Sequence, residues 1–326
     1  MSAVEATRPL ALRVGAPALG SLALIVGVVT LAIGGTAAVG ALFSALTNGT
    51  LTLSRLLPLL PLACWGYSLR FLRWHLLVRR AVPNLGWRDS FRAQAIGFGL
   101  SVTPGRVAEL WKLYLVERAT GVSAARSAGA MVVERLTDLV GFAGLAVGAG
   151  LVASRGLGQS QLIGALAAAL VLVVGVVARP FVTRRLALLG PSAVQNLIHG
   201  GDAVARPVPI GLALLALVLG RAGDGLVLWG VLAALGQPVS IPFAVFAFAS
   251  AGLVGGVSLL PGGLGAVEVT MVGILAAGGV PVQLGLVAAL LTRALILWIW
   301  VALGLALFAF DHLGNTLAVG QRLVRR

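Results

Sequence analysis

Long apolar stretches recur along most of the chain, and polar residues interrupt them only briefly. Six of the stretches are long enough to cross a hydrocarbon core of about 30 Å at about 1.5 Å per residue. We therefore expect an all-α polytopic membrane protein with about six full transmembrane helices. The expected spans are 16–46, 54–78, 126–153, 159–179, 208–235 and 282–310.

Two other segments, 89–118 and 241–278, each combine two short apolar or amphipathic pieces around a helix-breaking run. The residues at these breaks are Pro104, Gly105, Pro261, Gly262 and Gly263. A piece has about 14–16 residues, and 14 residues reach only about 21 Å, which is too short to span the bilayer core. Each segment is therefore either a re-entrant helical hairpin or a single broken crossing.

The basic residues distinguish these two topologies. If both segments are re-entrant, most loop arginines fall on the side of the two termini, and only Arg55 and Arg155 fall on the other side. If the first segment crosses, the arginines from Arg179 to Arg206 change sides and the bias is lost. Because Lys and Arg are enriched in cytoplasmic loops, we expect two re-entrant hairpins and cytoplasmic N- and C-termini.

An internal repeat accompanies this topology. The spacing from Gly121 to Arg135 equals that from Gly279 to Arg293. The unit helix–hairpin–helix thus occurs twice with one extra crossing in between, so the second unit is inverted relative to the first. Inverted repeats with broken helices are typical of secondary transporters and imply a cavity at their interface. We expect one membrane domain over 1–326, made of an N-terminal helix (1–53), repeat 1 (54–153), a linker helix (154–207), repeat 2 (208–310) and a cytoplasmic tail (311–326).

Composition excludes an ordinary soluble domain. The chain is 59% hydrophobic and 10% charged, with a mean hydropathy of +1.03, whereas soluble domains carry about 25% charged residues. The net charge of +14 does not indicate a nucleic-acid partner, because the basic residues lie mostly at the ends of apolar segments. A single cysteine, Cys64, and three widely separated histidines predict no disulfide framework, metal site or cofactor.

Charged residues within apolar segments are the candidate substrate-binding residues, because such charges normally face an aqueous path or one another. In the first repeat, three charges recur every third residue on the second half of the hairpin, and three more occupy the next helix. They are Arg106, Glu109, Lys112, Glu134, Arg135 and Asp138. A helix N-terminus beside Arg106 suits a phosphate or carboxylate. The alternatives are charges that snorkel to the interface and an ion-pair cluster that holds the hairpin to its neighbour.

The second repeat contributes three further candidates, Asp224, Glu268 and Arg293. Arg221 lies three residues before Asp224, which allows an internal pair on the helix face. Arg293 lies about halfway along its apolar helix and needs Glu268, Asp224 or an anionic ligand as partner. Mutual neutralisation of Glu268 and Arg293 stays an alternative to ligand contact. Arg70 and Arg73, beside Trp74, indicate an interfacial anchor, or else substrate recruitment.

These motifs together resemble the flippase-like membrane domain of the lysylphosphatidylglycerol synthase/flippase family, over nearly the whole chain. The residues that carry the resemblance are Arg73-Trp74, Pro104-Gly105-Arg106 with Glu109, Glu134-Arg135-Leu136-Thr137-Asp138, Pro261-Gly262-Gly263-Leu264-Gly265 with Glu268, and Arg293. The resemblance implies translocation of a polar or anionic-headgroup lipid through a cavity between two pseudo-symmetric halves, in a bacterial or archaeal cytoplasmic membrane. A partner enzyme of lipid biosynthesis is a further expectation.

Two-domain members of that family carry a soluble aminoacyl-transferase domain after the membrane part. About 15 residues follow the last expected span here, so we expect no synthase activity and no catalytic residue. One alternative is a polyprenyl-phosphate-dependent membrane glycosyltransferase, and another is a non-transporting scaffold. The glycosyltransferase class normally needs an outer carboxylate. The expected outer segments 47–54, 154–159, 236–241 and 278–282 contain no Asp or Glu.

Overall fold

The computed structural model describes residues 52–103, 108–153, 191–258 and 260–324. These residues form helices and no strand, which confirms an all-α membrane protein. The expected spans 16–46 and 159–179 lie outside the described residues, as do Pro104, Gly105 and Arg106. The principal helices in chain order are α3 (Leu53–Leu56), α4 (Leu60–Ala81), α5 (Trp87–Gly99), α6 (Trp111–Thr120), α7 (Ala124–Ala153), α9 (Pro191–Val204), α10 (Pro207–Ala234), α11 (Ile241–Val257), α12 (Ala266–Ala277), α13 (Val282–Arg293) and α14 (Ile299–Val324).

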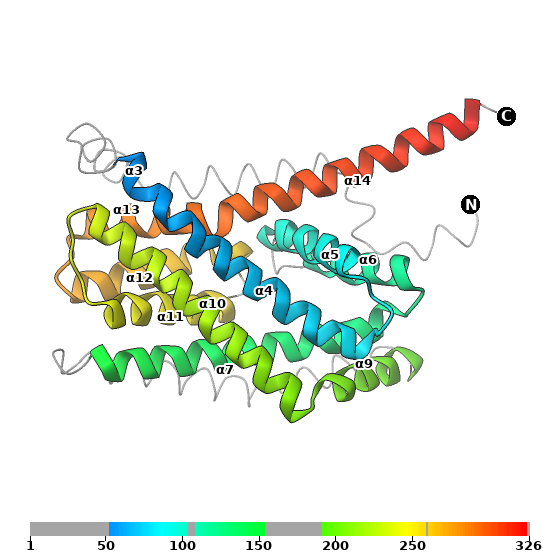
Figure 1. The fold of residues 1–326 in the computed structure, drawn as a ribbon, viewed down its shortest axis with the longest axis horizontal. Helices are drawn as coiled ribbons and strands as arrows, with labels where there is room; N and C mark the ends of the chain where they lie inside the picture. Colours follow the sequence, from blue (N-terminus) through cyan, green and yellow to red (C-terminus); the bar gives the residue numbers. More distant parts are fainter. Residues whose placement is uncertain (1–51, 104–107, 154–190, 259, 325–326) are drawn as a thin grey trace.

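Three long helices form the body of the molecule. α4, α7 and α10 pack against one another and run along the length of the protein in Figure 1. Three described segments are long and apolar enough to cross a membrane, namely Ala124–Ala153, Val208–Ala234 and Val282–Asp311. They match three expected spans. The span expected at 54–78 is also helical, but α4 carries several arginines and does not meet the same criterion.

Two helical hairpins occupy opposite ends of this body. α5 packs against α6, and α11 packs against α12, and Figure 1 shows the first pair toward the right and the second toward the left. The 3₁₀ turn after α5 (η3, Leu100–Val102) contacts the 3₁₀ turn after α11 (η5, Pro261–Gly263). The hairpins thus approach each other from opposite ends; the inverted repeat stays a prediction. Their re-entrant placement in a membrane stays a prediction.

Two apolar cores flank the middle of the molecule. One core joins the first turns of α4 and the end of α10 to α11, α12 and α13, with Leu228, Leu232 and Met271 fully buried. The other joins the end of α4 and the start of α10 to α5 and α6, with Trp74 and Leu77 fully buried. Each of the long helices contributes to both cores, so its central turns lie between them. Those turns carry the candidate site.

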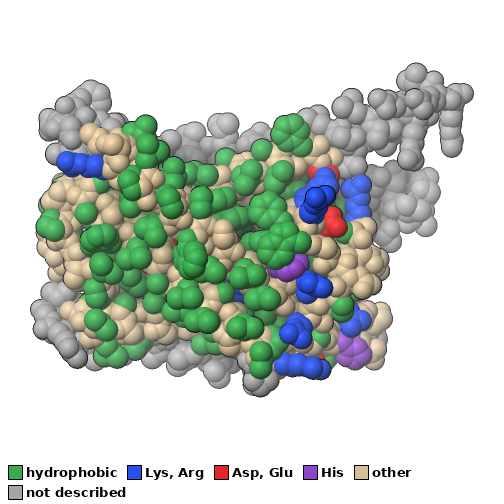
Figure 2. Space-filling model, viewed as in Figure 1, with side chains coloured by type: hydrophobic (Ala, Val, Ile, Leu, Met, Phe, Trp, Pro, Cys, Tyr) green, Lys and Arg blue, Asp and Glu red, His purple; other side chains and the backbone are tan. Residues whose placement is uncertain are grey.

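The surface agrees with a membrane environment. Apolar side chains cover most of the face seen in Figure 2, whereas Lys and Arg side chains gather toward one end. Exposed arginines cluster where α4 and α6 end and α5 begins, and they are Arg79, Arg80, Arg88, Arg92 and Arg118. Arg55 lies apart from this cluster in the chain, in α3 at the start of the α3–α4 segment. This segregation follows the arginine bias along the sequence.

Several elements differ from the expected ones. An additional amphipathic helix, α9, packs along α7 through Gly129, where a Cβ atom would collide with the backbone of Gly200 and Gly201. α14 continues to Val324, through the segment expected as a tail. The last expected span also contains a π-helical turn at Ala294–Trp298, which directly follows Arg293.

Candidate functional site

Arg73 of α4 and two carboxylates of α7 form the centre of a buried ion-pair network. The guanidinium of Arg73 lies 2.8 Å from Asp138 and 3.4 Å from Glu134. The Arg73 side chain is 2% exposed and that of Glu134 is also 2% exposed. Glu134 and Asp138 are four residues apart and therefore share one helix face. Burial makes this pairing necessary, because an unpaired charge at such a position is very costly.

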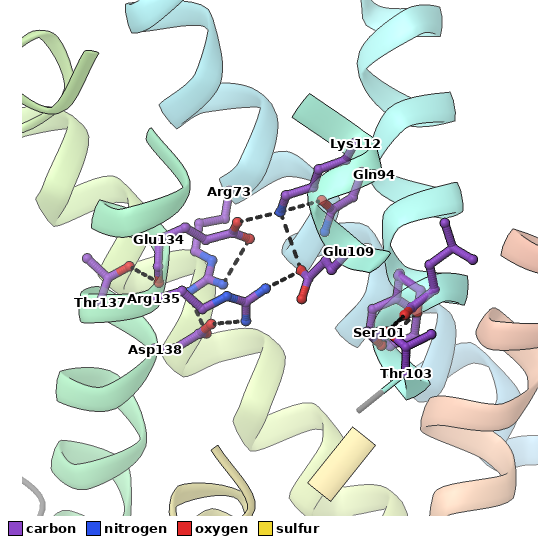
Figure 3. Close-up of polar contacts among 12 residues, drawn as sticks. Arg73, Gln94, Ser101, Thr103, Glu109, Lys112, Glu134, Arg135, Thr137 and Asp138 are labelled. Carbon is purple, nitrogen blue, oxygen red and sulfur yellow. Dashed lines mark hydrogen bonds and ion pairs between the residues drawn. The ribbon is translucent and has the colours of Figure 1, made fainter. Parts of the chain in front are cut away.

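The hairpin α5–α6 joins the network through Lys112, as Figure 3 shows. The ammonium of Lys112 lies 3.0 Å from Glu134 and 3.5 Å from Glu109, and donates to Gln94 over 3.4 Å. It also lies 3.9 Å from the centre of the Trp74 ring. Lys112 is fully buried, so these acceptors and the ring face replace its hydration.

Arg135 closes the network on its other side. Its guanidinium pairs with Glu109 of the first hairpin and lies 3.1 Å from Asp138. The side chain of Arg135 is 34% exposed, whereas those of its two partners are 4% and 13% exposed. Arg135 is therefore the member of the network that a ligand reaches most easily. The first hairpin is thus tied to α7 by charge at both Lys112 and Arg135.

The second repeat contributes two separate pairs. Arg221 lies 2.9 Å from Asp224 on α10, and its guanidinium lies 4.8 Å from the centre of the Phe142 ring. Arg293 lies 3.0 Å from Glu268 and donates to the Gly262 carbonyl over 2.7 Å. Arg221 and Asp224 thus form the internal pair that their spacing allows, and Arg293 is paired with Glu268, as in the alternative to ligand contact.

The break of the second hairpin depends on glycine. Gly262 and Gly263 have φ values of 57° and 70°, which favour residues without a Cβ atom. The first backbone amide before α12, at Gly265, donates to the Glu268 carboxylate over 2.7 Å. The positive end of this helix is thus occupied by the protein's own carboxylate, so a ligand anion must compete with Glu268 there.

Most of these charges line one cavity of about 210 Å³, and Lys112, Asp224 and Glu268 pair with residues of its wall. Residues of the ion-pair network, of the two second-repeat pairs and of both hairpins line the cavity. They include Arg70, Arg73, Glu109, Glu134, Arg135, Asp138, Arg221, Gly262 and Arg293. Phe98, Phe142 and Phe248 supply apolar walls. The volume far exceeds the space that one water molecule requires, so the cavity can hold a larger polar group. The cavity is therefore too large to be a gap that holds only one water molecule.

The structure brings most of the predicted site residues together. Glu109, Lys112, Glu134, Arg135 and Asp138 form the first network. Glu268 and Arg293 lie across the cavity at the second hairpin, and Asp224 pairs with the cavity residue Arg221. Arg106 falls outside the described residues.

Two expectations are wrong. The interfacial anchor expected at Arg70, Arg73 and Trp74 is not formed, because Trp74 is 0% and Arg73 2% exposed inside the network. The helix expected to begin beside Pro104 is α6, which begins at Trp111. Residues 108–110 adopt a 3₁₀ turn, and the Ala108 amide donates to the Thr103 hydroxyl over 3.2 Å. This bond caps the turn before the α-helix starts.

Sequence reasoning did not select Arg70, Arg73, Gln94 and Arg221 for the site. The arginine pair had a usable signal, since two arginines three residues apart share a helix face. Gln94 and the phenylalanines had none, because single polar or aromatic residues in short helices are common. Among the described residues, no group of three His, Cys, Asp or Glu side chains is arranged to hold a metal ion.

Two comparisons with known proteins identify the family of this chain. A curated relative, a membrane protein of the group UPF0104 from Methanothermobacter thermautotrophicus, is 32% identical over 124 residues. That alignment covers 38% of this chain and 37% of the relative. The family model described as "Lysylphosphatidylglycerol synthase TM region" matches residues 18–304, which include every charged residue of the cavity. The chain therefore belongs to the lysylphosphatidylglycerol synthase transmembrane-region family.

Proposed function

We propose that this protein is a flippase that moves a lipid with a polar or anionic headgroup across the cytoplasmic membrane. The headgroup passes through the charged cavity while the acyl chains remain in the surrounding lipid. The observation that carries this proposal is the cavity itself, which holds paired arginines midway between two apolar cores. Charges at such a depth in an apolar protein are typical of substrate pathways.

The ion pairs supply a way to bind and release an anion. A phosphate that enters the cavity offers Arg135 or Arg293 a second acceptor in place of Glu109 or Glu268. The carboxylates take the arginines back when the headgroup leaves. Because each buried charge keeps a partner in both states, the energetic penalty of an unpaired charge is avoided.

The hairpins supply a route for alternating access. They lie at opposite ends of the long helices and meet at η3 and η5. A displacement of one hairpin relative to α7 or α13 would open the cavity toward one end at a time, as in other inverted-repeat transporters. The arginine-rich end then faces the cytoplasm. A lipid-biosynthetic enzyme that delivers the substrate is a fitting partner.

We propose a transport role without a catalytic step. The described carboxylates of the cavity, Glu109, Glu134 and Asp138, are each paired with basic side chains. A general base for glycosyl transfer needs a carboxylate within reach of the attacking group and poised to accept its proton. The paired arrangement favours charge compensation over proton abstraction.

Leaflet exchange in liposomes tests the function. The protein would be reconstituted with fluorescent phosphatidylglycerol and phosphatidylcholine, and the fraction of label accessible to an external quencher would be followed over time. The variants Arg293→Ala and Glu268→Gln break the second-hairpin pair. The matched controls are Arg88→Ala and Glu117→Gln, which alter exposed residues outside the cavity.

We expect exchange by the wild-type protein and both controls, and slow exchange by the two cavity variants. Folded protein that exchanges neither lipid, or exchange that both cavity variants support at the wild-type rate, would contradict the proposed function. The second outcome would mean that translocation does not depend on this pair of cavity residues.

A further inference from the structure

The charges around the cavity do not balance. The described side chains of the ion-pair network, the two second-repeat pairs and the cavity wall comprise six basic and five acidic residues. The basic ones are Arg70, Arg73, Lys112, Arg135, Arg221 and Arg293, and the acidic ones are Glu109, Glu134, Asp138, Asp224 and Glu268. The described side chains in and around the cavity therefore carry one excess positive charge.

The excess charge can be assigned to Arg70. Five of the six basic side chains form an ion pair, whereas Arg70 forms none with any residue that the structure describes. Its guanidinium lies 4.5 Å from the centre of the Phe98 ring, and both residues line the cavity. An aromatic face holds a guanidinium in place but leaves its N–H groups able to donate to a ligand.

The residues around Arg70 leave its guanidinium available for an anionic ligand. Arg70 and Arg73 are three residues apart on α4 and therefore share one face. Arg73 is committed to Glu134 and Asp138, and Arg221 of α10 is committed to Asp224. Arg70 and Arg221 also line a second, small pocket beside the main cavity. Arg70 is thus a half-buried cation whose neighbours are already neutralised.

We propose that Arg70 is the primary contact for a phosphate anion in the cavity and that the preferred ligand carries one net negative charge. This inference rests on the proposed function for the source of the phosphate, a phosphodiester lipid headgroup. One negative charge neutralises the excess on the described side chains. A zwitterionic headgroup leaves it uncompensated, because its own cation cancels its phosphate. The planar guanidinium suits two phosphate oxygens at once.

Arg70 also permits an experiment that the paired arginines do not. Replacing Arg73 or Arg293 leaves a buried carboxylate without its partner, so loss of binding and loss of folding are difficult to separate. Replacing Arg70 leaves no described carboxylate unpaired. The Arg70→Gln variant should therefore be at least as stable as the wild-type protein without ligand, yet bind the anion more weakly.

Thermal unfolding of purified protein in detergent tests the inference. The probes are short-chain phosphatidylglycerol, short-chain phosphatidylcholine and inorganic phosphate, each titrated separately. The variants are Arg70→Gln, Arg70→Lys and the matched control Arg88→Gln, whose exposed side chain lies outside the cavity. A bound ligand raises the midpoint temperature with its concentration, so each titration yields an apparent Kd.

We expect phosphatidylglycerol to stabilise the wild-type protein and Arg88→Gln, and phosphatidylcholine to have a smaller effect. In Arg70→Gln the apparent Kd for phosphatidylglycerol should rise about tenfold or more, as for the loss of a charge-assisted hydrogen bond. Arg70→Lys should fall between Arg70→Gln and the wild-type protein, because it keeps the charge but not the planar fork.

Three results would overturn the inference: an unchanged Kd in Arg70→Gln, equal stabilisation by both lipids, or an Arg70→Gln protein that is destabilised without ligand.

Inorganic phosphate distinguishes the source of the anion. If it stabilises as strongly as the lipid and the effect needs Arg70, the anion site stands and the lipid-flippase function loses its support. Absence of leaflet exchange would contradict that function alone, because it does not alter the binding result.

Discussion

At the scale of single residues, the site depends on charges that stabilise one another. Glu134 accepts from both Arg73 and Lys112, and Arg135 bridges Glu109 and Asp138. These residues come from α4, the first hairpin and α7, so every one of these pairs except Arg135–Asp138 also joins two elements. Removal of a basic member leaves at least one buried carboxylate with fewer donors than it needs.

Arg73→Gln tests this interdependence. The substitution removes a 2%-exposed guanidinium and weakens the pairing of both Glu134 and Asp138. Breaking a buried pair by removing one partner costs about 3–5 kcal/mol, so the unfolding midpoint in detergent should fall markedly. Arg79→Gln is the matched control, since Arg79 lies on the same helix and is exposed. Equal midpoints for the two variants would contradict the structural role of Arg73.

The sequence indicates which charged residues belong to the site, but it does not indicate which of them pair with one another. Glu109, Arg135 and Arg293 stand out because each is a charge inside an apolar segment. The contact of Arg73 with Asp138 could not be predicted, because it joins residues 65 positions apart. Pairing across such separations depends on how α4 and α7 pack, and no local pattern encodes that.

At the scale of elements, close backbone approach determines where the hairpins lie. α5 packs against α14 at Gly99 and Gly304, where each glycine faces the backbone of the other helix. α7 approaches α9 in the same way at Gly129 and Gly200. Small residues at helix contacts are a general means of packing in membranes. Here they hold the first hairpin beside the cavity.

Gly304→Ala should destabilise the protein for this reason. A Cβ atom at Gly304 would collide with the Ala95 carbonyl and lie 2.8 Å from the backbone of Gly99, so α14 or α5 has to move. Gly144→Ala is the matched control, because nothing lies within 4 Å of a Cβ atom there. Alanine favours a helix over glycine by about 1 kcal/mol, so the control should be neutral or stabilising. Similar unfolding midpoints would contradict the packing argument.

The elements themselves were largely predictable. Apolar length predicted α7, α10 and the α13–α14 helix, and the helix-breaking runs predicted both hairpins. Two features could not be predicted. α9 is amphipathic but short, and it is specified by its packing on α7. α6 begins at Trp111, after a 3₁₀ turn at 108–110 whose first amide, at Ala108, donates to the Thr103 hydroxyl.

At the scale of the whole molecule, two apolar cores enclose a charged layer. The layer crosses α4, α7 and α10 near their centres and includes the tips of both hairpins. α10 is 28 residues long, or about 42 Å, and exceeds the roughly 30 Å thickness of a bilayer core. The proposed function therefore places the charged layer at the middle of the membrane, where an anionic headgroup meets its highest barrier. In that proposal the cavity lowers the barrier.

The most direct test of this account is to obstruct the cavity and measure leaflet exchange in the same liposomes. In a Cys64→Ser background, Gly256→Cys places a thiol in the cavity wall, where a Cβ atom has nothing within 4 Å. Gly144→Cys places one at an equally open position outside the cavity. A bulky thiol reagent would be applied, and mass spectrometry would confirm that both variants are modified.

If headgroups cross through the cavity, modification of Gly256→Cys should stop the exchange of labelled phosphatidylglycerol, and modification of Gly144→Cys should leave it unchanged. If the fully modified Gly256→Cys protein exchanges lipid at its unmodified rate, the charged cavity is not the translocation path.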